Sequence, residues 1–341
     1  MHAVVPMTVA PLTRRKWLQH SGAAAISTTG LTAAWSQTTP GNMDSAKIVV
    51  GSPAGAILDA FARRIADAVS PGFARNVIVE NRVGASGQIA TAFVRNAAPD
   101  GSTILLTPMP MMALFPHTYK RLPYDPVEDF TPVSLGATST LALGVGPMVP
   151  ASVKTVAEFV TWCKANPAQS SFGSPAAGST PHFAGIILGK AAGFDFVHVP
   201  FRGTAPAIND MMGSQIAAVV SPVGDFLPHL ESGRARLLAV ASSRRSRFVP
   251  SVPTFLELGY KDVVTSDWFA FFVPSKTPAP QLQKLSSVLK TALNAPEVTK
   301  AMELRGLETV WSTPAELGER LKADIAHWGG VVKGLGFTAE S

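Results

Sequence analysis

Cysteine is almost absent from this chain, since its 341 residues include only Cys163. A single cysteine excludes an internal disulfide and any cluster of cysteine ligands for zinc or iron. The seven histidines are scattered along the sequence, and none forms an H-E-x-x-H pair. We therefore expect no metal site and no cofactor. Cys163 lies on the apolar face of a helix expected over 152–167, which predicts an inert core residue.

Charged residues are also few, at 15% of the chain, whereas apolar residues reach 46%. The formal net charge is +6, but residues 1–36 hold three basic residues and no acidic one, which leaves +3 for the rest. After residue 36 no run of Lys or Arg has the length of a phosphate-tracking face, and SSRRSR (242–247) is typical of a solvated turn. The composition predicts a well-packed protein of two domains that binds no nucleic acid.

Long hydrophobic runs are missing as well, because no segment after residue 36 approaches the ~18 apolar residues of a membrane span. Residues 1–36 instead have the pattern of an export signal, with basic residues before a mildly apolar stretch. Ala34-Trp35-Ser36 places small residues where a signal peptidase needs them, so we expect cleavage before Gln37. The signal predicts a periplasmic protein that is soluble after cleavage.

The arginine pair Arg14-Arg15 distinguishes two export routes. Followed by Trp17-Leu18, the pair resembles a twin-arginine (Tat) signal. The segment departs from that pattern at Trp17 and Gln19, where Phe and Lys are usual. An ordinary Sec signal is the alternative.

Strand-like and helix-like runs alternate along most of the remaining chain, which is typical of open, mostly parallel sheets covered by helices. One series of alternations runs over 47–108 and a second over 171–243. The β-rich segments 133–146 and 268–274 are expected to cross between the two domains. We predict an α/β fold with a signal peptide at 1–36, a first domain at 46–135 plus 270–341, and a second domain at 136–269.

The familiar catalytic motifs are absent from the sequence. It contains no G-x-G-x-x-G fingerprint, no complete P-loop and no G-x-S-x-G elbow. GIILGKA (185–191) has the wrong spacing for a P-loop, and His198 is more typical of a core residue than of a base. No nucleophile stands at a readable spacing from a base, so we expect a protein that is not an enzyme.

Four turns rich in small residues do recur, each between a predicted strand and a predicted helix. Such turns present free backbone N–H groups to an anion. They are GSPAGA (51–56), RVGASGQ (82–88), GSPAAGSTPH (173–182) and PFRGTAPA (200–207). Ser179, Thr180 and Thr204 are expected near helix N-caps. Each turn alone fits a plain helix start, but four in both halves of the chain favour a shared ligand cleft.

The same turns lie within blocks that resemble the Bug family, the solute-binding proteins of tripartite tricarboxylate transporters. The resemblance covers nearly all of 46–337. Its main blocks are GSPAGAILDAFAR, VIVENRVGASGQIA, PDGSTILLT, GSPAAGSTPHFAG, HVPFRGTAPAINDMMGSQIAA, LESGRARLLAVASSRRSRFVPSVPTFLELGY and DWFAFFVPSKTPAP. It implies a type II periplasmic binding fold with two doubly wound domains and crossing hinge strands. It also implies a carboxylate ligand held in the interdomain cleft.

The resemblance completes the set of expected ligand-binding residues. Asp225 matches a position that in several family members meets the far end of the ligand. The first turn keeps the family's Pro53, Gly55 and Asp59, whereas Ala54, Ala56, Ile57 and Leu58 depart from its small and hydroxyl residues. The predicted ligand-binding residues are Pro53, Ala54, Gly55, Ala56, Ile57, Asp59, Ser174, Ala177, Ser179, Thr180, Thr204, Ala205, Pro206 and Asp225.

The resemblance implies a monomeric receptor that delivers an organic carboxylate to the membrane components of a transporter. Two alternatives remain open: an exported sensor that signals to a two-component system, and an exported α/β enzyme acting on a carboxylate or ester. The ligand also has two possible forms. If Ile57 faces the core, a small dicarboxylate is expected; if it faces the cleft, a monocarboxylate with an apolar body is favoured.

Overall fold

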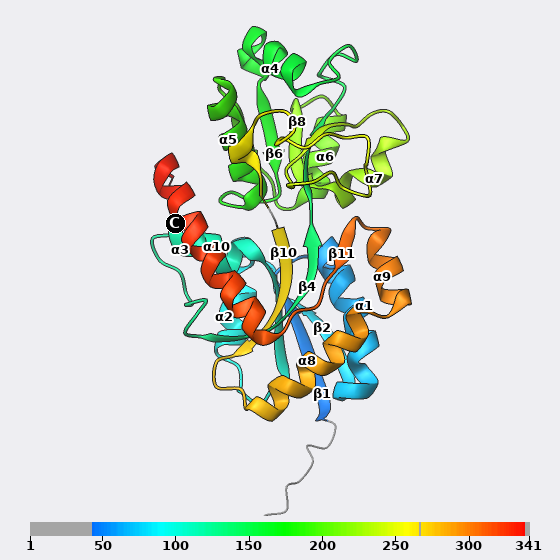
Figure 1. Ribbon diagram of the computed structural model, residues 1–341, viewed down its shortest axis with the longest axis vertical. Coiled ribbons are helices and arrows are strands. Elements are labelled where there is room, and N and C mark those ends of the chain that lie inside the picture. Colours follow the sequence, from blue (N-terminus) through cyan, green and yellow to red (C-terminus); the bar gives the residue numbers. More distant parts are fainter. Residues whose placement is uncertain (1–42, 266, 338–341) are drawn as a thin grey trace, which may run out of the picture. The chain divides into compact units, whose positions relative to one another are not determined.

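Two separate β-sheets organise the part of the chain that this computed structural model describes, residues 43–265 and 267–337. The predicted signal peptide at 1–36 lies outside these residues. The first sheet has six strands in the order β11-β4-β10-β3-β1-β2, and the second has five in the order β7-β6-β8-β5-β9 (Figure 1). Each sheet with its helices is called a lobe below.

Parallel pairing dominates one side of the first sheet, where β1 lies between β2 and β3. β10 then pairs antiparallel with both β3 and β4, and β11 extends the edge beside β4. The strands are β1 (Met43–Val50), β2 (Ala74–Asn81), β3 (Thr103–Pro108), β4 (Phe130–Ser139), β10 (Asp267–Pro274) and β11 (Leu307–Thr309). All eight residues of β10 are buried, because helices cover both faces of this sheet.

Two hydrophobic clusters hold helices against the first sheet. One joins it to α1 (Ile57–Phe73), α8 (Ala279–Leu293) and α9 (Pro296–Glu303). The other joins it to α2 (Gln88–Arg95), to a π-helical turn (Pro110–Leu114) that leads into α3 (Phe115–Thr118), and to α10 (Pro314–Leu335). The sequence predicted the long helices but neither the π-helical turn nor the three-residue strand β11.

The second sheet repeats this arrangement. β6 (Ser171–Ser174) pairs parallel with β7 (Val197–Pro200) and β8 (Ala218–Pro222), while β5 (Leu141–Val145) is antiparallel to β8 and to β9 (Arg236–Val240). One cluster packs α4 (Val156–Ala165) and α5 (Thr180–Ala192) on it, and another packs α6 (Thr204–Met212) and α7 (Val223–Leu230). Cys163 is buried in the former cluster, as predicted, and this burial raises the pKa of its thiol to about 11.

The chain passes between the lobes twice. Thr140 alone separates β4 in the first sheet from β5 in the second, so the predicted crossing within 133–146 is confirmed. The return differs from the expectation, because the predicted segment 268–274 already belongs to β10 of the first sheet. The second crossing therefore lies between the end of β9 and the start of β10. The fold is the predicted α/β class with two lobes, whereas the exact domain boundaries remain a prediction.

Close approach between the lobes occurs at two glycines. A methyl group at Gly224, on α7, would lie 1.7 Å from the carbonyl oxygen of Arg305, just after α9. Gly306, which has a left-handed φ of +67°, would place its own methyl group 2.6 Å from the Cα atom of Gly224. Only glycine lets the two backbones meet here.

Two glycine substitutions test the packing within the lobes. A Cβ atom at Gly144 in β5 would lie 2.3 Å from the ring of Phe226, so Gly144→Ala should destabilise the protein by about 1–3 kcal/mol through overpacking. Gly330 is exposed inside α10 with open space around it, so Gly330→Ala should stabilise the helix by about 0.5–1 kcal/mol. Urea unfolding measures both; equal effects would contradict the packing described.

Candidate functional site

A cleft of about 1680 Å³ opens between the lobes. Residues from all four of the predicted small-residue turns line it, together with side chains from β3, β10 and α9. All four of these turns connect a parallel strand to the helix that follows it, which is where open α/β folds place their ligand sites. The topology therefore brings to one cavity segments that lie far apart in sequence.

The first turn joins β1 to α1 and is held in shape by Asp59. Its carboxylate accepts hydrogen bonds from the Gly55 amide (2.9 Å) and the Asn81 side chain (2.8 Å), and it pairs with Arg63 (3.0 Å). Burial would raise the pKa of Asp59, but the bonds from Arg63, Gly55 and Asn81 hold it below its usual value. Asp59 does not line the cleft; it fixes Gly55, whose φ is +84°.

The second turn has an unusual run of left-handed backbone. Gly84, Ala85, Ser86 and Gly87 all have positive φ, at 134°, 46°, 53° and 93°. Non-glycine residues adopt such angles at a cost that is typical of functional sites. Successive amides in turns of this kind form a concave surface that suits an anion. The turn also packs closely on the first one, since a Cβ atom at Gly51 would lie 2.7 Å from the Gly87 Cα atom.

The third turn joins β6 to α5, and two serines order it. Ser174 Oγ and Ser179 Oγ both donate to the carbonyl oxygen of Ala176, at 3.0 and 2.7 Å. Ser179 occupies the predicted N-cap position, but its hydroxyl stabilises the turn in place of the helix. Ser174 and Thr180 are buried and do not line the cleft.

Two stacked histidines support the third turn from behind. His182 Nδ1 accepts a hydrogen bond from the Gly178 amide (3.0 Å), so this nitrogen carries no proton. The ring of His198 stacks on it at a centroid distance of 3.6 Å, and its Nε2 lies 2.7 Å from Ser174 Oγ. Burial lowers the pKa of His182 to about 4, and burial with the neighbouring His182 lowers that of His198 to about 3. His198 is thus a structural residue, as the sequence indicated.

The fourth turn leads from β7 into α6 and corrects one expectation. The N-cap of α6 is Gly203, with φ of +104°, and Thr204 is the first helical residue. Thr204 was predicted as the cap, but its Oγ1 instead lies 2.9 Å from Ser221 Oγ, which donates to Asp225 Oδ2 at 2.8 Å. Burial raises the pKa of Asp225, and the bonds from Ser221 and Thr204 offset part of this.

Helix starts at the cleft differ from two helix starts elsewhere. Among the described residues, the N-caps of α1, α5, α6 and α7 make no side-chain cap hydrogen bond. α4 and α10 begin with complete capping boxes at Thr155 and Thr313, whereas α8 and α9 also begin without a side-chain cap. First-turn amides that no side chain caps are available to a ligand. The four uncapped helices therefore direct the positive ends of their dipoles toward the cleft.

The structure brings together eleven of the fourteen residues predicted to bind the ligand. These line the cleft: Pro53, Ala54, Gly55, Ala56, Ile57, Ala177, Ser179, Thr204, Ala205, Pro206 and Asp225. Asp59, Ser174 and Thr180 do not. Whether the eleven contact a ligand remains a prediction.

Sequence reasoning missed several charged side chains of the cleft. Arg64, Arg202, Arg305 and Asp267 all line it. Arg202 lies inside a turn that the sequence singled out. Arg64 comes from α1, Arg305 from the turn after α9, and Asp267 from the start of β10. Burial raises the pKa of Asp267 to about 7, although the Trp268 amide donates to it at 2.9 Å.

Comparisons with known proteins agree with this architecture. A family model described as the tripartite tricarboxylate transporter family receptor (TctC) matches residues 61–337. The BugT protein of Bordetella pertussis is 32% identical over 295 residues, which are 85% of this chain and 89% of BugT. The chain belongs to the TctC family.

Solved structures of TctC-like receptors have the same fold. The periplasmic binding protein BugD has a TM-score of 0.79 at 29% identity, and the match covers 87% of this chain and 99% of BugD. Rpa4515 of R. palustris, solved with adipate, has a TM-score of 0.80 at 28% identity and covers 86% and 98%. MatC of Rhodopseudomonas palustris, solved with bound malate, has a TM-score of 0.77 at 27% identity. That match covers 85% of this chain and 99% of MatC. The predicted family and periplasmic-binding fold are confirmed.

Two kinds of feature are absent from the described part of this TctC family member. None of its helices is long and apolar enough to cross a membrane. No group of three or more His, Cys, Asp or Glu residues there is arranged to hold a metal ion.

The buried histidines predict a pH dependence of stability. Folding lowers the pKa of His182 from about 6.5 to about 4. Between these pH values His182 is therefore protonated in the unfolded chain but neutral in the folded chain. The free energy of unfolding should be full above pH 6.5 and fall below it, by up to about 1.4 kcal/mol per pH unit for this residue. His182→Gln, which keeps an acceptor for Gly178, should reduce the loss in urea unfolding at pH 7 and pH 5.

Asp267 serves as an internal control in that comparison. Its raised pKa opposes the histidine effect, since stability from a neutral buried carboxyl decreases as pH rises toward 7. Both proteins keep Asp267, so the difference between them reports on His182 together with its effect on the stacked His198. Parallel pH profiles would contradict the assignment.

Proposed function

We propose that this receptor captures a small organic carboxylate in the cleft and delivers it to the membrane components of a tripartite tricarboxylate transporter, acting as a periplasmic binding protein and not as an enzyme. The observation that carries the proposal is the convergence of four uncapped helix starts and four glycine-containing turns on one cavity. Adipate and malate in two related structures support a carboxylate.

The magnitudes require several turns to act together. A charge at one helix N-terminus gains about 0.3–1 kcal/mol when exposed and ~2 kcal/mol in a favourable, partly buried position. Micromolar affinity needs about 8 kcal/mol. A cleft that closes on the ligand and expels water strengthens each interaction, so convergent turns on both lobes supply what one turn cannot.

Several large apolar residues line the cleft. They are Met111, Phe115 and Phe269 from the first lobe and Phe201 from the second. Ile57, whose orientation the sequence left open, also lines it while packing partly against the core of the first lobe. Burial of ligand hydrocarbon against these residues contributes about 25 cal/mol per Å². We infer that the ligand has an aliphatic or aromatic body.

Two carboxyl groups oppose a second negative charge on the ligand. Asp225 and Asp267 both line the cleft, and burial raises the pKa of each. If a ligand carboxylate lay beside Asp225 or Asp267, that aspartate would have to stay protonated, or the two negative charges would repel each other. Both carboxyls suit a hydroxyl or an apolar end group. The carboxylate is therefore assigned to the amides of the turns, with the hydroxyls of Ser179 and Thr204 nearby.

Ligand titration tests the proposal directly. Isothermal titration with benzoate and with succinate should show saturable binding of benzoate at higher affinity. Ile57→Ser, which replaces apolar wall with a hydroxyl, should weaken benzoate binding about tenfold and leave or strengthen succinate binding. Arg75→Ala, an exposed site on β2, serves as a matched control. Tighter binding of succinate by the wild-type chain would overturn the ligand assignment, and chemical change of a bound carboxylate would overturn the receptor assignment.

Closure of the lobes gives a second test. Because a methyl group at Gly224 would collide with the Arg305 backbone, Gly224→Ala should hold the lobes apart at this edge. We expect carboxylate affinity to fall about tenfold and the radius of gyration with saturating ligand to exceed that of wild type. Gly334→Ala, at an open position on α10, is the control. Unchanged affinity in Gly224→Ala would show that binding does not require this contact.

A further inference from the structure

The cleft contains a buried carboxyl group that the protein leaves partly unpaired. Asp267, at the start of β10, lines the cleft and is only 6% exposed. Its Oδ1 accepts a hydrogen bond from the Trp268 amide at 2.9 Å. Its Oδ2 has no hydrogen-bond or ion-pair partner among the described residues. Buried polar atoms are nearly always paired in folded proteins, so this oxygen calls for an explanation.

The unpaired oxygen is open to the cavity and is not sealed inside the protein. The fully buried side-chain atoms that lack a partner in the described part of the chain all belong to other residues. Oδ2 therefore retains access to the cleft that Asp267 lines. The pairing of β10 with β3 ends at Phe269 and Pro108, so Asp267 lies beyond the end of β3 and pairs only with Ser139 of β4.

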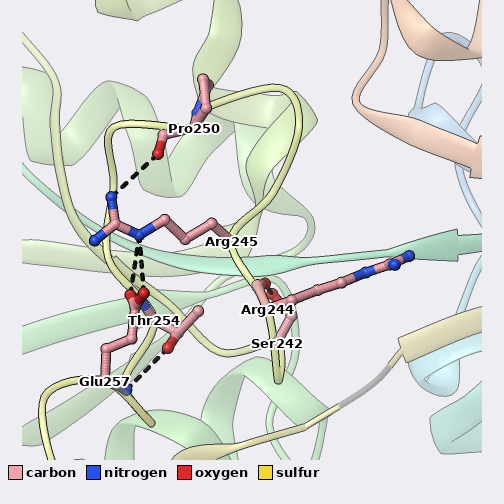
Figure 2. A network of polar contacts seen from close by, with 6 residues as sticks. All are labelled: Ser242, Arg244, Arg245, Pro250, Thr254 and Glu257. Carbon is pink, nitrogen blue, oxygen red and sulfur yellow. Dashed lines mark hydrogen bonds and ion pairs between the residues drawn. The ribbon is translucent and has the colours of Figure 1, made fainter.

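The backbone on both sides of Asp267 is held in place. In the second lobe, the Thr265 amide donates to the Ala241 carbonyl oxygen at 2.8 Å. The loop that follows β9 is fixed by Arg245, whose Nε donates to Glu257 at 3.0 Å (Figure 2). In the first lobe, Asp267 belongs to the ladder between β10 and β4. A polar group held in this way suits specific recognition, because little ordering remains to be done on binding.

Asp225, the other carboxyl group of the cleft, already has a partner. Its Oδ2 accepts a hydrogen bond from Ser221 Oγ at 2.8 Å, and Thr204 Oγ1 lies 2.9 Å from the same hydroxyl. The carboxyl group that needs a partner from the ligand is therefore that of Asp267.

The charge of the cleft disfavours a cation as that partner. Its acidic lining residues are Asp225 and Asp267. Its basic lining residues outnumber them, and they are Arg64, Arg202 and Arg305. A positively charged ligand group beside Asp267 would have to overcome this excess of positive charge, whereas a neutral donor would not.

A hydroxyl group fits the unpaired oxygen in either protonation state of the carboxyl. Burial raises the pKa of Asp267 to about 7, with a contribution from the charge of Asp324 and against the bond from the Trp268 amide. Both states are therefore populated near neutral pH. An ionised carboxylate accepts a hydrogen bond from a hydroxyl, and a protonated carboxyl donates one to it. An ammonium group suits only the ionised state, and a second carboxylate suits only the protonated one.

We propose that the ligand of the cleft carries a hydroxyl group in addition to its carboxylate, and that Asp267 binds this hydroxyl through Oδ2. This assignment rests on the proposed function, because it takes the ligand to be a carboxylate held by the turn amides. Phe269 lies two residues along the same face of β10 and also lines the cleft, so the hydrocarbon body packs beside the hydroxyl. The ligand class is a hydroxylated monocarboxylate.

Matched pairs of carboxylates test the assignment by isothermal titration of the full chain. Benzoate is compared with meta- and para-hydroxybenzoate, and hexanoate with its terminally hydroxylated form, whose flexible chain lets the hydroxyl reach different depths. At least one hydroxylated compound should bind about tenfold more tightly than its parent. A hydroxyl that met no partner in the cleft would lose its water and weaken binding instead.

Substitution of Asp267 shows whether the gain in affinity comes from this carboxyl. Asp267→Leu should abolish the gain, whereas Asp267→Asn, whose amide still pairs with a hydroxyl, should keep most of it. Benzoate itself should bind Asp267→Leu more tightly than wild type, because a carboxyl that opposes its charge is removed. Asp44→Leu, the same change at an exposed aspartate on β1, should alter neither result.

The ligand pairs keep the test decisive on the wild-type chain even if Asp267→Leu fails to fold. If a parent carboxylate binds and no hydroxylated form binds more tightly, the hydroxyl assignment is overturned while the proposed function stands. If no carboxylate binds up to about 10 mM, both are overturned. Tighter binding of para-(aminomethyl)benzoate, which carries an ammonium group, would overturn the assignment in favour of a cation site. Loss of the gain in Asp225→Leu but not in Asp267→Leu would also overturn it.

Discussion

The carboxyl ends of parallel strands constrain this molecule more than any single contact. A parallel strand must be followed by a crossover, and the helix of that crossover begins at the edge where the strand ends. β1, β6 and β7 all end at the cleft, so α1, α5 and α6 all begin there. The backbone amides at these helix starts converge on the cavity because the strand topology places every one of these helix starts at the same edge. The side chains then adjust what the backbone has already positioned.

These adjustments lie largely behind the cavity wall. Asp59 holds the Gly55 amide, the neutral ring of His182 holds that of Gly178, and Ser174 fixes the carbonyl of Ala176. None of the three supporting side chains lines the cleft. They hold the backbone of the turns that line the cleft, and the Gly55 and Gly178 N–H groups are themselves used in these bonds. Substitution in this supporting layer would alter the cleft without touching a ligand, which is the usual relation between a site and its scaffold.

Local sequence patterns predicted the fold well because each strand–turn–helix unit is specified by residues that lie close together in the sequence. The four turns, the two series of alternations and the crossing at Thr140 all depend on neighbouring residues. Thr204 shows the limit of such reasoning. A hydroxyl beside a helix start predicts an N-cap, but the Thr204 hydroxyl instead bonds Ser221, seventeen residues along the chain, which in turn donates to Asp225. The sequence did not predict Arg64, Arg305 and Asp267 as cleft residues for the same reason, since only the tertiary fold brings them to the cavity.

The contact of Gly224 with Arg305 and Gly306 has a mechanical consequence. Gly224 and Arg305 line the cleft, whereas Gly306 lines a second cavity of about 460 Å³ beside the crossings. This single backbone contact thus forms part of the wall of both cavities. A change in the angle between the lobes that moved this contact would therefore alter the width of both cavities together.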